Sequence, residues 1–131
     1  MRLILEPSFP TRESTFLQTP FVSTQRWREP LATDADLVAA AAKTASSAVV
    51  FLGRQALGRP DVLRSAKEHK VTIIATETYN PIDALDYLRD NLGRIGKKVR
   101  DRAEALLVQS NRLMEYSIDE LLERRLELGS S

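Results

Sequence analysis

Two short apolar runs constrain the fold of this chain more than any other feature of its sequence. The runs AVVFLG (48–53) and VTIIAT (71–76) are continuous rather than alternating, which is the pattern of strands buried on both faces. Helical patterns precede, separate and follow them. This order, with its short connections, predicts a mostly parallel sheet covered by helices. We therefore expect an α/β fold, a small Rossmann-like three-layer domain.

Local signals give the predicted helices their starts. Thr33 and Asp36 resemble a capping box at the head of an alanine-rich helix. Pro60 fits the first turn of the helix between the two apolar runs. Asn80 offers a cap for the next helix, which is predicted to stop at Gly93.

After Gly96 the sequence predicts a closing pair of helices over residues 97–128. The first is expected to be one long amphipathic helix through Tyr116, and the second to open at a capping box of Ser117 and Glu120. The apolar positions that suggest the long helix are Val99, Ala103, Leu106, Leu107, Leu113 and Met114.

The amino-terminal third carries weaker signals. The run RLILE (2–6) predicts a strand, and residues 7–32 predict an extended, proline-containing arm or loop. Within that arm, FVSTQRW (21–27) is rich in β-branched and aromatic residues and predicts an edge strand. At 131 residues, the chain has the length of a single domain over 1–131.

Composition excludes several classes of function. The sequence has no cysteine, so disulfides, thiolate catalysis and cysteine-bound metals are ruled out. A net charge of +1 gives no general attraction to nucleic acid or membranes. The apolar segment before Pro7 is too short for a signal peptide, and no apolar run is long enough to span a bilayer. We expect a cytoplasmic protein without a cofactor or metal.

A ligand of an open parallel sheet binds beyond the carboxyl ends of its strands. After residue 53 the loop GRQALGRP offers Gly53, Arg54, Gly58 and Arg59, and after residue 76 the loop offers Thr76 and Thr78. Glycine amides, a helix start near Pro60 and two arginines suit an anion such as a phosphate. The alternative, which we favour, is that the glycines only turn the chain and the arginines are solvated.

One dense basic run follows the predicted sheet: Arg94, Lys97, Lys98, Arg100 and Arg102. A solvated helix start is favoured over a nucleic-acid contact, because no aromatic residues are interleaved to stack on bases. The single histidine, His69, has no clear catalytic partner. No catalytic residues are therefore assigned.

From residue 48 onward the order of features resembles the DRTGG domain, a small α/β regulatory domain. The resemblance rests on VVFLG (49–53), RPDVLRSAKEH (59–69), VTIIAT (71–76) with Glu77-Thr78, and continues through 93–106 into 116–126. The family's Asp-Arg-Thr-Gly-Gly string is absent. The resemblance implies regulation and subunit assembly rather than chemistry.

The sequence thus predicts a non-enzymatic regulatory or assembly domain that forms a homo-oligomer, most simply a dimer, and senses a phosphorylated metabolite or nucleotide. Two alternatives stay open. One is a nucleic-acid-associated protein that uses the basic run of residues 94–102. The other is an enzyme that acts on a small phosphorylated substrate.

Overall fold

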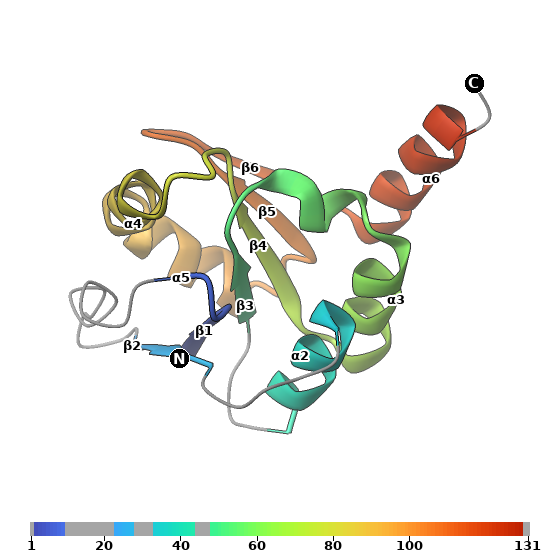
Figure 1. Cartoon of the computed structure of the whole chain (residues 1–131), viewed down its shortest axis with the longest axis horizontal. Coiled ribbons are helices and arrows are strands. Elements are labelled where there is room, and N and C mark those ends of the chain that lie inside the picture. Colours follow the sequence, from blue (N-terminus) through green and yellow to red (C-terminus); the bar gives the residue numbers. More distant parts are fainter. Residues whose placement is uncertain (1, 10–22, 28–32, 44–47, 130–131) are drawn as a thin grey trace.

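The computed structural model describes residues 2–9, 23–27, 33–43 and 48–129 of the chain. Within these ranges the strands form one six-stranded sheet in the order β2-β1-β3-β4-β5-β6. Helices cover both faces of this sheet, so the molecule has three layers (Figure 1). The predicted α/β, mostly parallel architecture is confirmed.

The described elements alternate along the chain as the two apolar runs suggested. Their bounds, in order, are β1 (Arg2–Leu5), β2 (Ser23–Arg26), α2 (Asp34–Ala41), β3 (Ala48–Phe51), the 3-10 helix η1 (Arg54–Gly58), α3 (Pro60–His69), β4 (Thr72–Thr76), α4 (Pro81–Asp90), α5 (Leu92–Arg100), β5 (Ala105–Val108), β6 (Leu113–Tyr116) and α6 (Ile118–Gly129).

Strands β3 and β4 form the centre of the sheet. They pair in parallel with Val49 opposite Ile73 and Val50 opposite Ile74, and every residue of both strands is buried. Since successive side chains of a strand point to opposite faces, each strand supplies both cores of the molecule. The prediction of two fully buried strands is confirmed.

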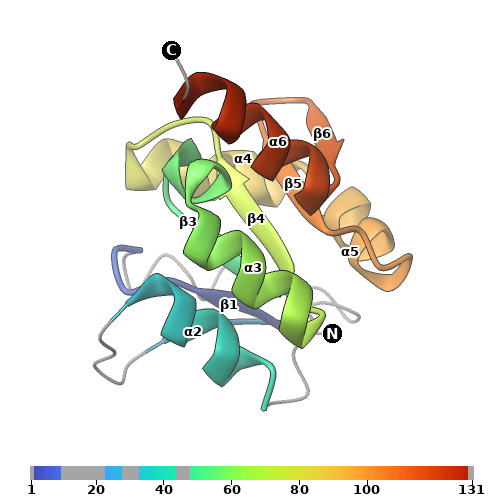
Figure 2. The same cartoon turned by 90° about the vertical axis from the view of Figure 1, so that its right-hand side faces the viewer.

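The sheet separates two hydrophobic clusters. Val49 and Ile73 belong to the cluster under α2, α3 and α6, whereas Val50 and Ile74 belong to the cluster under α4 and α5. Figure 2 shows α2, α3 and α6 in front of the sheet, on the side that faces the viewer.

Two consecutive connections of the sheet have opposite hands. The chain steps in one direction from β3 to β4 to β5, but α3 packs on one face and α4 with α5 on the other. One of the two crossovers is therefore left-handed, an arrangement that parallel sheets rarely adopt. Its consequence is that α3 and α5 reach the amino edge of the sheet from opposite faces.

The predicted long helix over 97–116 is wrong, and with it the adjacent pair of helices at the carboxyl end. Helix α5 ends at Arg100, and the antiparallel strands β5 and β6 follow before α6. The sequence ALLV (105–108) is a short, continuous apolar run, so it forms a buried strand like the two runs before it. The last helix and its cap at Ser117 are confirmed, because Ser117 Oγ accepts from the amide of Glu120.

Gly93 does not end a helix, contrary to the prediction. Helix α4 ends at Asp90, and Gly93 lies in the first turn of α5. The strand predicted over 2–6 and the edge strand predicted over 21–27 are confirmed as β1 and β2 within the described positions. Most of the arm predicted over 7–32 lies outside the described residues. Within the described ranges, every helix is too short or too polar to span a bilayer.

Candidate functional site

The structure brings the two predicted loops together at the carboxyl edge of the sheet. The amide of Gly53 donates a hydrogen bond to Thr76 Oγ1 at 3.0 Å, and that hydroxyl donates to the carbonyl oxygen of Thr78 at 3.0 Å. Thr78 Oγ1 in turn accepts from the amide of Asn80. These predicted ligand groups are therefore bonded to one another, and together they fix the two loops.

The predicted arginines neutralise carboxylates of this chain instead of facing one common point. Arg54 Nη1 lies 3.1 Å from Glu77 Oε1, in the second loop. Arg59 pairs with Asp34 at the start of α2. Gly58 ends the 3-10 helix η1, directly before Arg59. The carboxyl edge is thus held by contacts within the chain, and the anion site at Gly53, Arg54, Gly58, Arg59, Thr76 and Thr78 stays a prediction.

An aromatic ring covers the backbone of the first loop. Gly53 has φ +82° and ψ 164°, a conformation that is essentially restricted to glycine. A Cβ at this position would lie 2.1 Å from Cε1 of Tyr79, so the ring packs directly on the glycine. Tyr79 is nevertheless 53% exposed, and Ile82 at the start of α4 is 52% exposed.

The basic residues on which the nucleic-acid alternative depends do not form one continuous surface in the structure. Lys98 Nζ lies 2.8 Å from Glu115 Oε1 of β6, and this carboxylate raises the pKa of Lys98 above its ordinary value. Arg94 donates to the carbonyl oxygen of Asn111. Lys97 is an exposed residue of α5. Arg100 and Arg102 line a pocket at the opposite edge of the sheet.

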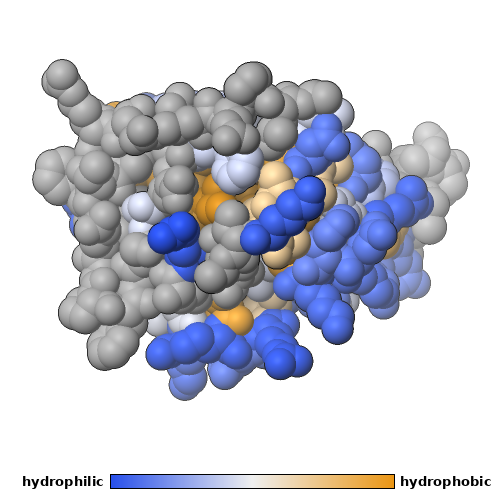
Figure 3. All heavy atoms as spheres, turned by 90° about the horizontal axis from the view of Figure 1, so that it is seen from below, coloured by the Kyte–Doolittle hydropathy of each residue, from blue (hydrophilic) through white to orange (hydrophobic). Residues whose placement is uncertain are grey.

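This amino-edge pocket lies where β4 and β5 begin, between the ends of α3 and α5 and the start of α6. It has a volume of about 570 Å³, within the range of small-molecule sites. Figure 3 shows this side of the molecule, with hydrophobic surface visible between hydrophilic side chains. The lining residues are Ala66, Lys67, Lys70, Val71, Thr72, Val99, Arg100, Arg102, Ala103, Glu104 and Ile118.

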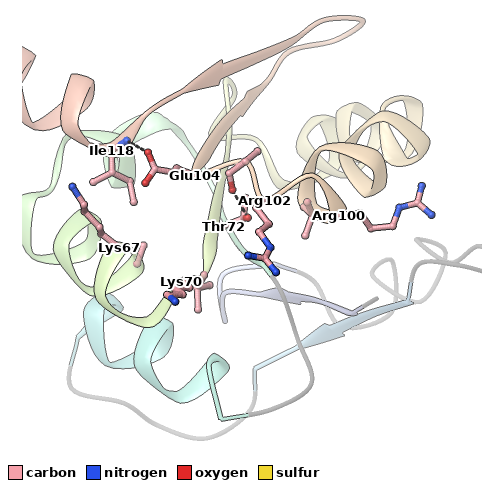
Figure 4. Close-up of a pocket in the computed structure, with 11 residues that line it drawn as sticks. Lys67, Lys70, Thr72, Arg100, Arg102, Glu104 and Ile118 are labelled. Atoms are coloured by element: carbon pink, nitrogen blue, oxygen red, sulfur yellow. Dashed lines mark hydrogen bonds between the residues drawn. The ribbon is translucent and has the colours of Figure 1, made fainter.

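Three of the polar residues that line the pocket, Thr72, Glu104 and Lys67, already have partners. Thr72 Oγ1 donates to the carbonyl oxygen of Ala103, and Glu104 Oε1 accepts from the amide of Ile118 at 3.0 Å. Lys67 pairs with Asp119, and this hydrogen bond raises the pKa of Lys67 above its ordinary value. Figure 4 shows Lys67 and Glu104 toward α6, Lys70 and Arg102 beside the start of β4, and the guanidinium of Arg100 pointing away from the other labelled residues.

Sequence reasoning assigned Arg100 and Arg102 to a helix surface and did not anticipate the pocket. His69, which it set aside, lies at the exposed end of α3 with Nδ1 2.9 Å from the carbonyl oxygen of Ser65. In the part of the chain that the structure describes, histidine, aspartate and glutamate nowhere gather in a group of three that could hold a metal ion.

Comparison of the chain with protein-family models, with curated proteins and with solved structures finds no match. The resemblance to the DRTGG domain therefore stays a prediction.

Proposed function

We propose that this chain is a non-enzymatic regulatory domain that assembles with a second copy of itself through its carboxyl-edge surface, formed by Arg54, Tyr79, Ile82 and Asp83. The observation that carries this proposal is the exposure of Tyr79 and Ile82. Among the described residues, these two are the large hydrophobic side chains that stay exposed. Both belong to the start of α4 and the loop before it.

The backbone under this surface is held in place before any partner arrives. Asn80 Oδ1 accepts from the amides of Ile82 and Asp83 at 3.0 and 3.1 Å, and Gly53 is bonded to Thr76 beneath the tyrosine ring. A preorganised surface loses little conformational entropy on association. Tyrosine is also enriched at the centres of protein interfaces.

Charge favours a second copy of this chain as the partner. The surface carries Arg54 in its first loop, an exposed arginine that pairs with Glu77 within one chain, and Asp83 in the first turn of α4. Two copies related by a two-fold axis present the same surface to each other, so the cation of one can face the anion of the other. A dimer is the simplest closed assembly of this kind.

The test is the mass in solution, measured by light scattering at tens of micromolar, against the 14.7 kDa of one chain. We expect a dimer for the parent protein and a monomer for the variant Tyr79→Ser with Ile82→Ser. The control Glu68→Ser changes an exposed residue of α3 and should remain dimeric. A parent protein that is monomeric at this concentration contradicts the proposal.

A charge exchange separates this surface from any other route to a dimer. Arg54→Glu or Asp83→Arg alone should weaken the dimer, because each places like charges across the two-fold axis. The two changes together should restore it. If all three variants have the same mass in solution as the parent dimer, the dimer interface lies elsewhere on the molecule.

A further inference from the structure

We propose that the amino-edge pocket binds a phosphate monoester of about the size of a mononucleotide, with its phosphate held between Lys70 and Arg102. This site lies at the opposite edge of the sheet from the carboxyl-edge surface, and the inference does not depend on the association proposed above. It rests on the backbone, the charge and the shape of the pocket.

The backbone is the first support. Helices α3 and α5 end in the same way: the amide of Val71 donates to the carbonyl of Ala66, and the amide of Ala103 donates to the carbonyl of Lys98, each at 3.0 Å. Such a bond, five residues back along the chain, belongs to the Schellman ending, which places one residue in the left-handed conformation. Glycine is the usual residue there.

In this chain both left-handed positions are basic. Lys70 has φ +57° and Arg102 has φ +64°, and within the described ranges these are the residues other than glycine with positive φ. A side chain in this conformation costs about 1–2 kcal/mol relative to the ordinary helical one. Both strained positions carry a long cation, and both line the same pocket. Residual strain of this kind is typical of functional sites.

The charges of these two side chains are free for a ligand. Within the described part of the chain, neither Lys70 nor Arg102 makes an ion pair, whereas Lys67 and Lys98 are each paired with a carboxylate. Figure 4 shows the two side chains on either side of the start of β4. An arginine and a lysine that make no ion pair suit a phosphate group, which accepts several charge-assisted hydrogen bonds.

The rest of the pocket favours a small molecule with an apolar body. Its walls include the buried side chains of Ala66, Val71 and Val99. At the α6 end, Glu104 presents a carboxylate of which one oxygen accepts from the amide of Ile118. The second oxygen suits a hydroxyl or amino donor of the ligand. One end of the pocket therefore selects for phosphate and the other for a hydrogen-bond donor.

This geometry separates a small ligand from a nucleic-acid strand. A strand needs a continuous basic groove with aromatic stacking, whereas the described residues that line the pocket include no aromatic one. Lys98 is neutralised by Glu115, and the guanidinium of Arg100 points away from the pocket. Among the described residues, Lys70 and Arg102 are cations of this pocket without an ion pair, and they line one cavity instead of following a track.

The test replaces both strained cations by glycine. In the variant Lys70→Gly with Arg102→Gly, both helix ends receive the residue that their backbone favours, so the fold should be at least as stable as that of the parent protein. Calorimetry with AMP, ATP and inorganic phosphate should show binding of AMP to the parent below millimolar concentration and at least tenfold weaker binding to the variant. Adenosine, which lacks the phosphate, should bind far more weakly than AMP.

The matched control is Lys43→Ala with Arg64→Ala, which removes the same charge from two exposed residues outside the pocket. It should leave AMP binding unchanged. The proposal is overturned if none of the three probes binds the parent below millimolar concentration, or if the glycine variant and the control lose affinity equally. It is also overturned if a single-stranded oligonucleotide binds more tightly than AMP.

Discussion

At the scale of the residue, Gly53 determines the conformation of the carboxyl edge. It joins β3 to η1 with a backbone that other residues adopt only under strain, and it leaves room for the ring of Tyr79. Its amide also holds Thr76. The glycine therefore serves the turn, as the favoured interpretation of the sequence had it.

We predict that Gly53→Ala destabilises the fold. The conformation alone costs about 1–3 kcal/mol for a residue with a side chain, and the new methyl group must also displace Tyr79. Denaturant unfolding measures the loss. In the background of Tyr79→Ala the collision is removed but the backbone strain remains, so the alanine should still be unfavourable. No loss in either background would contradict the conformation of this loop.

Individual residues also limit what the sequence could reveal about the site. The glycines and arginines of residues 53–59 were found because their types suggest phosphate chemistry, but their partners Glu77 and Asp34 are distant in the sequence. Lys70 and Arg102 carry a weaker signal. Each stands where a helix turns into a strand and no glycine is present, so a basic residue has to adopt the left-handed conformation.

At the scale of the element, the central strands and their helices were predictable and the carboxyl-terminal third was not. Residues 48–53 and 71–76 are continuous apolar runs bounded by turn-forming residues. Their burial at the centre of the sheet therefore follows from the sequence pattern. In residues 97–116 the end of α5, the strand β5 and the strand β6 follow one another so closely that their apolar residues imitate a helical repeat. Ser110 and Asn111, between β5 and β6, are turn-forming residues that could have broken this repeat.

One ion pair distinguishes the observed hairpin from the predicted long helix. In a continuous helix, residues 98 and 115 would lie about 25 Å apart at 1.5 Å per residue. In the structure Lys98 Nζ is 2.8 Å from Glu115 Oε1, which joins α5 to β6. The hydrogen bond to Glu115 is the main cause of the raised pKa of Lys98.

We predict that Glu115→Gln lowers the pKa of Lys98 toward its ordinary value, as measured by NMR titration of labelled lysine. Because this pKa is raised on folding, the pair stabilises the fold below the ordinary lysine pKa of about 10.4, and the contribution is lost as pH rises through the folded value. The difference in stability between the parent and Lys98→Met should therefore be constant near neutral pH and shrink in alkali. If the pKa of Lys98 is unchanged in Glu115→Gln, the ion pair does not form, and the continuous helix predicted over 97–116 would be favoured over the observed hairpin.

At the scale of the whole molecule, our two proposals assign one function to each edge of a single sheet. The carboxyl edge is closed by hydrogen bonds and presents Tyr79 and Ile82, which suits association. The amino edge is hollow and presents two cations, Lys70 and Arg102, that make no ion pair within the described residues, which suits a ligand. The opposite hands of the crossovers bring α3 and α5 to the amino edge from opposite faces, so each supplies one of these cations. This arrangement could not be predicted, because sequence patterns do not encode the face to which a helix returns.

The two hydrophobic clusters should respond independently to mutation, and this is the prediction that tests the three-layer architecture. Ile73 and Ile74 are neighbours in β4, yet they pack on opposite faces of the sheet. Ile73→Val and Ile74→Val should each cost about 0.5–1.5 kcal/mol in denaturant unfolding, and the double variant should lose the sum to within about 0.5 kcal/mol.

The comparison for this test is a pair of substitutions on one face of the sheet, Val49→Ala with Ile73→Val. These residues lie opposite each other in β3 and β4 and belong to one cluster, so their truncations open connected space and should deviate from additivity. If Ile73 and Ile74 instead couple as strongly as this pair, the sheet does not divide the core. Because the mutations remove only one or two methyl groups each, all the variants should still fold, and the comparison depends on the faces of the sheet alone.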